Sequence, residues 1–290
     1  MEIQRVNLRI SNIVPPLQMN VYKGNDYVIS QVLQDWGIWE RAGTQLSLKY
    51  IKSGFNVLDI GANIGYYTLL FSRCVGVTGC VYAFEPEPDN FCILQSNICL
   101  NQVANVVLSQ SALSDEQGQA WLYKTKYNLG DHRLSYNKGA VPIRVDISTL
   151  DNVFSNQEIN INFVKIDTQG AEEKILRGMQ KIIAKNTHYM TILIEFSPRL
   201  LILMSNDYLS FLSLLKELNA RIMQFSIGYH GQLEFKSIGI KDLERIARHL
   251  LSTEFEDAGM DLLLFFSEQA ERQFLLSQIN SPSRYWLTIQ

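Results

Sequence analysis

The chain has 290 residues, of which 47% are hydrophobic and 19% charged, and its mean hydropathy is close to zero. Such a composition is typical of a soluble protein that is large enough for one domain with an extension. The net charge of −3 argues against dominant binding to nucleic acid or to anionic membranes, because neutralising phosphates requires a surplus of Lys and Arg.

Targeting and membrane signals are not evident in the sequence. The first twelve residues are charged at three positions and lack the apolar core of a signal peptide. No apolar run approaches the roughly 18 residues of a transmembrane helix. The four cysteines lack paired C-x-x-C spacing, so we expect small buried thiols, with neither disulfides nor metal sites. These features predict a cytoplasmic protein.

The N-terminal part and the rest of the chain have different hydrophobic patterns. Between Asp26 and Lys52 apolar residues recur at helical spacing, so residues 1–53 are predicted to be a helical extension. From Phe55 onward, short apolar runs alternate with amphipathic segments. Strands are predicted at 57–60, 80–84, 106–109, 161–166 and 190–196, and helices at 64–75, 89–100 and 171–185.

This alternation predicts a doubly wound, mostly parallel α/β sheet of the Rossmann-like class, with helices on both faces. Later strands at 221–225 and 260–266 are expected to add an antiparallel edge. We therefore predict a main domain over residues 54–270 and a C-terminal tail over 271–290. The polar segment 124–146 within the main domain is predicted to be a substrate-loop insertion.

The turn after the first predicted strand has the sequence DIGANIG, residues 59–65. Gly61 allows a sharp turn and lets a ligand approach the main chain. Asn63 stands where a dinucleotide fingerprint has its second glycine, and Asn tolerates a left-handed backbone. Gly65 would let the following helix pack tightly on the strand. The N-terminus of that helix points free N–H groups into the crevice.

Glu85 directly follows the second predicted strand, where an acid can accept hydrogen bonds from ribose hydroxyls. Nicotinamide, flavin and S-adenosylmethionine cofactors share this arrangement. The last is favoured because Asp59 could reach a cationic amino group through water. The missing second glycine also suits a ligand without a pyrophosphate on the turn. A turn-capping role for Asp59 and a solvated strand-end charge for Glu85 are the structural alternatives.

A set of motifs in a fixed order resembles the FkbM-type methyltransferases. The motifs are VLDIGANIGYYT (57–68), AFEP (83–86), LSD (113–115), TLD (149–151), FVKIDTQG (163–170) and LRG (176–178). The resemblance runs from about Trp39 to Phe196. It implies a class I methyltransferase fold, S-adenosylmethionine as the methyl donor, and O-methylation, often of hydroxyls on sugars or natural products.

The resemblance also assigns cofactor-binding residues by motif position. Thr68 would help to seat the methionine end of the cofactor. Ser111, Ala112 and Asp115, which are also ordinary turn residues, would lie near the adenine. The remaining positions that the motifs place against the cofactor are Asp59, Gly61, Asn63, Gly65 and Glu85.

One position departs from the pattern of the family. FkbM-type sequences usually have Asp-x-Glu-Gly after the strand at 161–166, whereas this chain has Gln169 in place of the Glu. Gln keeps the hydrogen-bonding reach of Glu but lacks its charge. The change puts in doubt any role for residue 169 as a base or metal ligand, and it could mark a different substrate subgroup.

Candidate catalytic residues lie where ligands of doubly wound sheets bind, at the carboxyl ends of the strands. Asp167 and Glu195 end successive strands and could deprotonate a hydroxyl. His132, in the predicted insertion, is a third candidate that Asp131 or Asp167 could orient. Glu40 would fold over the cofactor from the extension. A helix-capping Asp167 and a surface His132 are the structural alternatives, and magnesium held by Asp167 and Glu195 is the less favoured alternative to a site without metal.

The sequence thus predicts an S-adenosylmethionine-dependent methyltransferase that acts on a hydroxyl of a small molecule, such as a sugar or natural product. A nitrogen or carboxylate acceptor, or a catalytically inactive protein that binds the same cofactor, remains an alternative. A nicotinamide-dependent oxidoreductase would be expected to keep G-x-G-x-x-G, which Asn63 interrupts.

Overall fold

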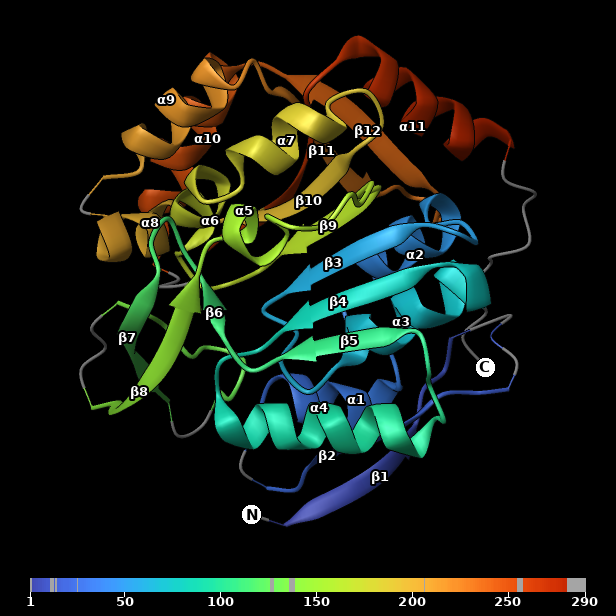
Figure 1. Cartoon of the computed structure of the whole chain (residues 1–290). Helices are drawn as coiled ribbons and strands as arrows, with labels where there is room; N and C mark the ends of the chain where they lie inside the picture. The colour runs from blue at the N-terminus through green and yellow to red at the C-terminus, as the bar shows by residue number, and fades with distance from the viewer. Residues whose placement is uncertain are drawn as a thin grey trace.

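The computed structural model describes residues 2–280 apart from 11, 12, 14, 25, 126, 127, 136–138, 206 and 255–257. An eight-stranded sheet lies at its centre, in the order β12-β11-β13-β10-β9-β3-β4-β5 (Figure 1). The strands are β3 (Asn56–Ile60), β4 (Cys80–Phe84), β5 (Val106–Ser109), β9 (Phe163–Ile166), β10 (Thr191–Phe196), β11 (Arg221–Ile227), β12 (Leu233–Ile238) and β13 (Met260–Phe265).

The directions of the strands confirm the predicted fold class. Strands β5, β4, β3, β9 and β10 are parallel, whereas β13 is antiparallel to both β10 and β11. The antiparallel strand β13 therefore lies inside the sheet, and β12, antiparallel to β11, forms the outer edge. The fold is a doubly wound, mostly parallel α/β sheet.

Helices cover both faces of this sheet because the buried strands are apolar on both sides. In β3, for example, Val57 faces one hydrophobic core and Leu58 the other. The first core is closed by α2 (Arg41–Tyr50), α3 (Tyr66–Val75), α4 (Pro88–Leu100) and α11 (Glu268–Asn280). The second is closed by α5 (Leu150–Val153), α6 (Glu172–Arg177), α7 (Gln180–Asn186), α8 (Pro198–Ser205), α9 (Leu209–Glu217) and α10 (Ile240–Leu251).

The N-terminal extension was predicted to be helical, but only part of it is. Two antiparallel strands, β1 (Ile3–Asn7) and β2 (Gln18–Tyr22), precede α1 (Ile29–Trp36) and α2. In β2, Met19 and Val21 are fully buried, and the side chain of Asn97 in α4 bonds to both backbone groups of Asn20. Alternating burial is the period of a strand, so the hairpin packs on α4 as a further cover of the first core.

Two other segments differ from prediction. The helix expected over 171–185 is divided into α6 and α7, because Gly178 approaches the carbonyl oxygen of Ser114 so closely that a Cβ would lie 2.0 Å away. The region around the insertion forms a second sheet. Its strands are β6 (Ala112–Leu113), β7 (Gly118–Lys124) and β8 (Val141–Ser148), in the order β6-β8-β7.

The four cysteines are free thiols, but the prediction that all of them are buried is wrong for two. Cys74 and Cys80 are half-buried, whereas Cys92 and Cys99 are exposed on the solvent side of α4. In the described part of the chain, no helix combines the length and the apolar character that a membrane span requires.

Candidate functional site

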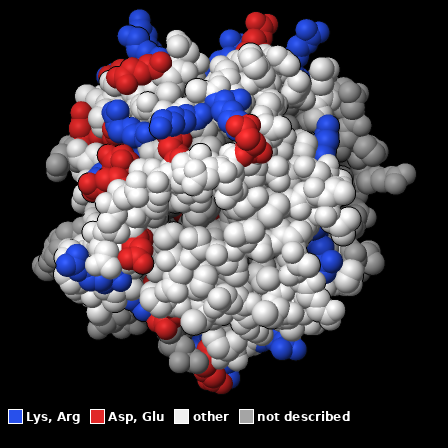
Figure 2. Space-filling model, viewed as in Figure 1, with Lys and Arg blue, Asp and Glu red and all other residues white. Residues whose placement is uncertain are grey.

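Two adjoining cavities form one crevice at the carboxyl ends of β3, β4 and β9. The larger has a volume of about 670 Å³ including its open mouth, and the smaller about 330 Å³. Figure 2 shows the molecule hollowed near the middle of the face that Figure 1 presents, with mostly uncharged residues around the opening. Ile29, Gly61, Asn63 and Asp167 line both cavities, so a single elongated ligand could occupy the two together.

The turn after β3 separates the two cavities. Gly61 has φ +82°, and a Cβ there would lie 1.9 Å from the carbonyl oxygen of Asp167, so no side chain fits. Asn63 has φ +49°, which confirms its predicted left-handed conformation. At Gly65 a Cβ would lie 2.5 Å from the side chain of Leu94 in α4. Gly65 therefore allows α3 to approach α4, and not the strand as predicted.

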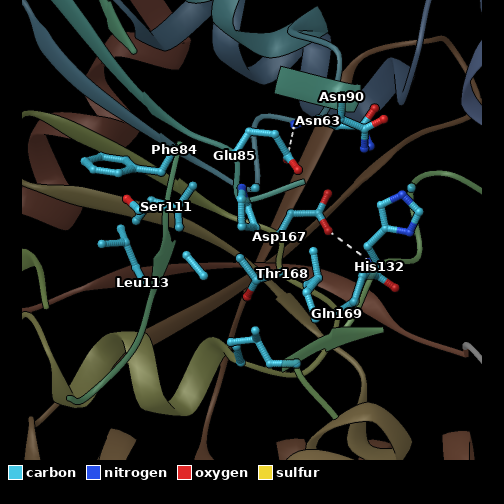
Figure 3. A pocket seen from close by; sticks show the side chains of 18 of the residues that line it. Asn63, Phe84, Glu85, Asn90, Ser111, Leu113, His132, Asp167, Thr168 and Gln169 are labelled. Atoms are coloured by element: carbon cyan, nitrogen blue, oxygen red, sulfur yellow. Dashed lines mark hydrogen bonds between the residues drawn. The ribbon is translucent and has the colours of Figure 1, made fainter. Parts of the chain in front are cut away.

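Glu85 lies in the larger cavity with its carboxylate held by the backbone (Figure 3). One oxygen, Oε2, accepts the N–H of Asn63 at 2.8 Å, and the other, Oε1, accepts the N–H of Glu87 at 2.9 Å. Burial raises the pKa of Glu85 to about 8 against the lowering effect of these two donors. A carboxylate oxygen can accept further bonds, so both oxygens can still receive hydroxyls from a ligand.

Asp59 lies on the wall of the smaller cavity and is 1% exposed. Its Oδ2 accepts the hydroxyl of Thr68 at 2.5 Å, and its Oδ1 has no hydrogen-bond partner among the described residues. Burial raises the pKa of Asp59 to about 6, partly offset by Lys165. Thr68 lines neither cavity, so it positions Asp59 and does not itself reach the methionine end of a ligand.

Lys165 is a charged residue of the site that the sequence analysis did not identify. It is 5% exposed, its Nζ lies 2.7 Å from Oδ2 of Asp167, and it lies 4.6 Å from the ring centroid of Tyr67. Burial lowers its pKa, but the carboxylates of Asp167, Glu40 and Asp59 outweigh this and keep Lys165 protonated. A Lys within an otherwise apolar strand was the available signal, because Lys is rarely buried without a partner.

Asp167 and Glu195, the predicted catalytic carboxylates, are brought together through Gln169. Its Nε2 donates to Asp167 Oδ1 at 3.1 Å and to Glu195 Oε2 at 3.0 Å. Burial raises the pKa of Asp167, but Lys165 and the other donors bring it below its usual value. The pKa of Glu195 is raised well above its usual value by burial and by Asp167. Of the two, Glu195 is therefore the stronger base, but it lines neither of the two cavities, whereas Asp167 lines both.

Glu40 occupies the boundary of the smaller cavity. Its Oε2 accepts the hydroxyl of Tyr67 at 2.8 Å, and Tyr67 and Trp39 line that cavity, whereas Glu40 itself lines an outer groove. Its backbone has φ +40°, an unusual value for Glu. Burial raises its pKa, and Lys165 opposes that effect. Trp39 of the extension thus lines the smaller cavity, whereas Glu40 does not lie directly in it.

His132 lines the larger cavity, but its hydrogen bonds do not suit the predicted role as a base. Its Nδ1 accepts the N–H of Thr125 at 3.2 Å, so the proton of the neutral ring lies on Nε2, which has no partner among the described residues. Burial lowers the pKa of His132 to about 4. Asp131 does not orient it, because its carboxylate accepts from Arg133 at 2.7 Å. His132 therefore offers a hydrogen-bond donor.

Two of the three predicted adenine-contacting residues lie in the crevice. Ser111 and Ala112 line the larger cavity beside Phe84 and Leu113, which together form a largely apolar wall. Asp115 does not reach it. After β6 the chain turns away, and the exposed Asp115 carboxylate lies 3.7 Å from Nζ of Lys174 on α6.

Comparison with known proteins agrees with this geometry. The model of the methyltransferase FkbM domain matches residues 59–222, more than half of the chain. The chain belongs to the FkbM methyltransferase family.

Two curated relatives are methyltransferases. This FkbM-family protein is 28% identical over 158 residues to the hexuronic acid methyltransferase AglP of Haloferax volcanii, a match that covers 53% of this chain and 63% of the relative. It is also 28% identical over 145 residues to methyltransferase 1 of Beauveria bassiana, which covers 42% of this chain and 57% of that protein. The chain thus spans about three fifths of the length of these relatives.

Some solved structures have a similar fold. They include methyltransferase FkbM from Methylobacillus flagellatus, with 15% identity over 73% of this chain and 43% of that chain and a TM-score of 0.43. Another is the SAM-dependent O-methyltransferase from Thermotoga maritima, with 11% identity over 79% of this chain and 66% of that chain and a TM-score of 0.41.

The insertion of this family member forms the wall of the larger cavity opposite β4. The carbonyl oxygen of Leu129 accepts the side-chain amides of Asn63 at 2.9 Å and Asn90 at 3.1 Å. Lys124 adds an ion pair with Asp89 at 2.7 Å. These bonds connect the insertion to the turn after β3 and to α4.

Proposed function

We propose that this protein transfers the methyl group of S-adenosylmethionine to a hydroxyl oxygen of a small, sugar-like molecule. The observation that carries the proposal is the position of two carboxylates on either side of the Gly61–Gly65 turn. Glu85 in the larger cavity suits ribose hydroxyls, and Asp59 in the smaller cavity suits an ammonium group. A nucleoside joined to an amino acid carries both groups at its two ends.

The residues of the crevice fit this cofactor. The adenine would lie on the apolar wall of Phe84, Ala112 and Leu113, and the ribose on Glu85. The buried Oδ1 of Asp59, which has no hydrogen-bond partner among the described residues, would receive the α-ammonium group. The side chain of Asn63 occupies the space beside the turn and bonds to Leu129, which disfavours a pyrophosphate there. When bound, the cofactor supplies an activated methyl group.

Glu195 is proposed as the proton acceptor. As the bond from the acceptor oxygen to the methyl carbon forms and the carbon–sulfur bond breaks, the hydroxyl proton passes to the Glu195 carboxylate. Asp167 stays ionised through its ion pair with Lys165. His132, with its proton on Nε2, would donate a hydrogen bond to the acceptor. Holding nucleophile and methyl group in line supplies much of the rate enhancement.

The substrate class is proposed from a relative that acts on a hexuronic acid. Such a sugar acid has both hydroxyl and carboxylate oxygens, so carboxyl methylation is the second candidate. The acidic groups around Asp167 would repel a carboxylate acceptor and favour a hydroxyl. A labelled methyl donor with uronic acids as acceptors tests this, because an ester is lost in alkali whereas an ether is retained. A cytoplasmic location, suggested by the unpaired thiols, is also a proposal.

Binding of the cofactor is tested separately from the acceptor. Calorimetry with S-adenosylhomocysteine should show binding that NAD does not, and thermal stability should rise with ligand concentration. At a hundred times the dissociation constant the gain is about 2.7 kcal/mol. We expect Glu85→Ala to weaken this binding at least tenfold, whereas Ala at the exposed Glu116 should leave it unchanged. Equal affinities for these two variants would contradict the ribose assignment.

A further inference from the structure

The turn after β9 holds Gln169 in a conformation that few non-glycine residues adopt. Its φ is +58°, which costs an L-residue roughly 1 kcal/mol or more. The next residue, Gly170, cannot be replaced without strain, since a Cβ would lie 2.7 Å from the carbonyl oxygen of Leu200. The packed turn therefore fixes where the Gln169 side chain begins. Its amide bonds to both Asp167 and Glu195, and Figure 3 shows Gln169 beside Asp167.

Both hydrogens of the Gln169 amide are used by carboxylates of two different strands. Nε2 donates to Asp167 Oδ1 at 3.1 Å and to Glu195 Oε2 at 3.0 Å. An amide between two carboxylates must present its NH₂ group, because its oxygen would be repelled. Carboxylates this close usually share a proton or a cation. Here Lys165 neutralises Asp167, and Glu195 receives the amide.

The uncharged Gln169 amide lies among several carboxyl groups. Carboxyl groups face the pair from several elements, and Lys165 on β9 supplies the opposing positive charge. Asp261 on β13 is the direct register partner of Glu195, and burial raises its pKa to about 7. The charged groups that act on Glu195 or Asp167 are Lys165, Glu172 on α6, Asp261 and Glu40.

We propose that Gln169 is a positioning residue whose amide takes the place of a cation between Asp167 and Glu195. This rests on the proposed function, in which Glu195 receives the proton of the acceptor. A divalent ion at the same place would occupy the oxygens of Glu195 and lower its affinity for a proton. The neutral amide orients Glu195 by donating to its Oε2. A Glu at position 169 would instead place a third carboxylate here.

The variant Gln169→Glu tests the proposal without an acceptor substrate. Replacing the donor with a carboxylate of the same shape should create a site for a hard divalent ion. We expect Mn²⁺ to bind Gln169→Glu at least tenfold more tightly than wild type, measured by the loss of the free Mn²⁺ signal in electron paramagnetic resonance. A Gln169→Glu protein that binds Mn²⁺ no better than wild type overturns the proposal.

A second variant covers the case in which Gln169→Glu does not fold. Gln169→Met keeps the length of the side chain and removes both N–H donors. Since those donors favour the charged form of Glu195, their loss should raise its pKa and move the pH at which thermal stability falls upward. An unchanged pH profile for Gln169→Met contradicts the positioning role.

Binding of S-adenosylhomocysteine, measured on the same samples, separates this inference from the proposed function. If wild type does not bind S-adenosylhomocysteine, the cofactor assignment is refuted, but the Mn²⁺ comparison stays valid. Once an acceptor is found, wild type should retain its turnover in EDTA. Turnover that EDTA abolishes and Mg²⁺ restores would show that the wild-type reaction needs a divalent ion and would overturn the inference.

Discussion

Asp59 on β3 and Lys165 on β9 are register partners across two parallel strands, and both side chains are buried in the smaller cavity. They do not neutralise each other directly. Lys165 reaches forward to Asp167, and Asp59 accepts the hydroxyl of Thr68 and keeps one oxygen open among the described residues. The relationship leaves one oxygen of a buried carboxylate without a hydrogen-bond partner among the described residues, which is costly unless a ligand completes it.

Lys165 should be essential for stability, because it compensates buried carboxylates. Breaking a buried ion pair by removing one partner typically costs about 3–5 kcal/mol. We expect Lys165→Met to lose stability of this order in urea unfolding at pH 8, and less at pH 5, where neighbouring carboxyls gain protons. Lys185→Met, which removes a surface pair with the exposed Glu158, should change stability by less than about 1 kcal/mol. Similar losses for the two variants would argue against a compensating role for Lys165.

Asp59 should make the ligand-free protein less stable as the pH rises. The pKa of Asp59 is raised from 3.8 to about 6 in the fold, so the folded state holds its proton more tightly than the unfolded state. Its contribution is fully present below about pH 4 and is lost as the pH rises through about 6. At about 1.4 kcal/mol per pKa unit, Asp59→Asn should gain up to about 3 kcal/mol at pH 7.

The same variant should bind the cofactor more weakly, because it lacks the carboxylate for the ammonium group. The measurement is urea unfolding between pH 4 and 8, with S-adenosylhomocysteine titrations on the same protein. If the free energy of unfolding depends on pH in the same way in wild type and in Asp59→Asn, the fold does not raise the pKa of Asp59.

Gly61→Ala should destabilise the protein by more than the usual cost of placing Ala at a positive φ, and it should disrupt the crevice. The added Cβ would meet the carbonyl oxygen of Asp167 at 1.9 Å, a backbone atom that cannot move freely. Gly231, with φ +78° and open space around it, is the matched control. We expect Gly231→Ala to cost about 1–2 kcal/mol and Gly61→Ala clearly more, with loss of ligand binding. Equal costs in thermal unfolding would mean that the turn can relax.

We expect His132 to act as a hydrogen-bond donor through its Nε2–H group and not as a base. In His132→Asn the side-chain oxygen can still accept the N–H of Thr125, while the Nε2 donor is lost. Turnover should fall about tenfold, in line with the loss of one hydrogen bond, while the affinity for S-adenosylhomocysteine stays within about twofold. Because the pKa of His132 is lowered to about 4, the wild-type rate profile should show no His132 titration near pH 6.5. Such a titration that disappears in His132→Asn would restore the base assignment.

The local patterns of the sequence were sufficient to predict the central fold. Apolar runs at β3, β4, β9 and β10 and the helices between them predicted a doubly wound sheet, which the strand order confirms. The left-handed Asn63 was also foreseen from its position in the turn. The β1–β2 hairpin was missed, since the buried face of β2 is apparent only against α4.

What the sequence determined by itself was therefore the set of elements and the presence of acids at the ends of strands, because both follow from short-range periodicity and turn chemistry. Tertiary structure decided which acids act together. Lys165 beside Asp59, and Gln169 between Asp167 and Glu195, depend on strand order and register. It also decided that Asp115 faces away and that His132 carries its proton on Nε2. Charges that meet only after long-range pairing acquire their pKa values from the fold, because burial and neighbours set them.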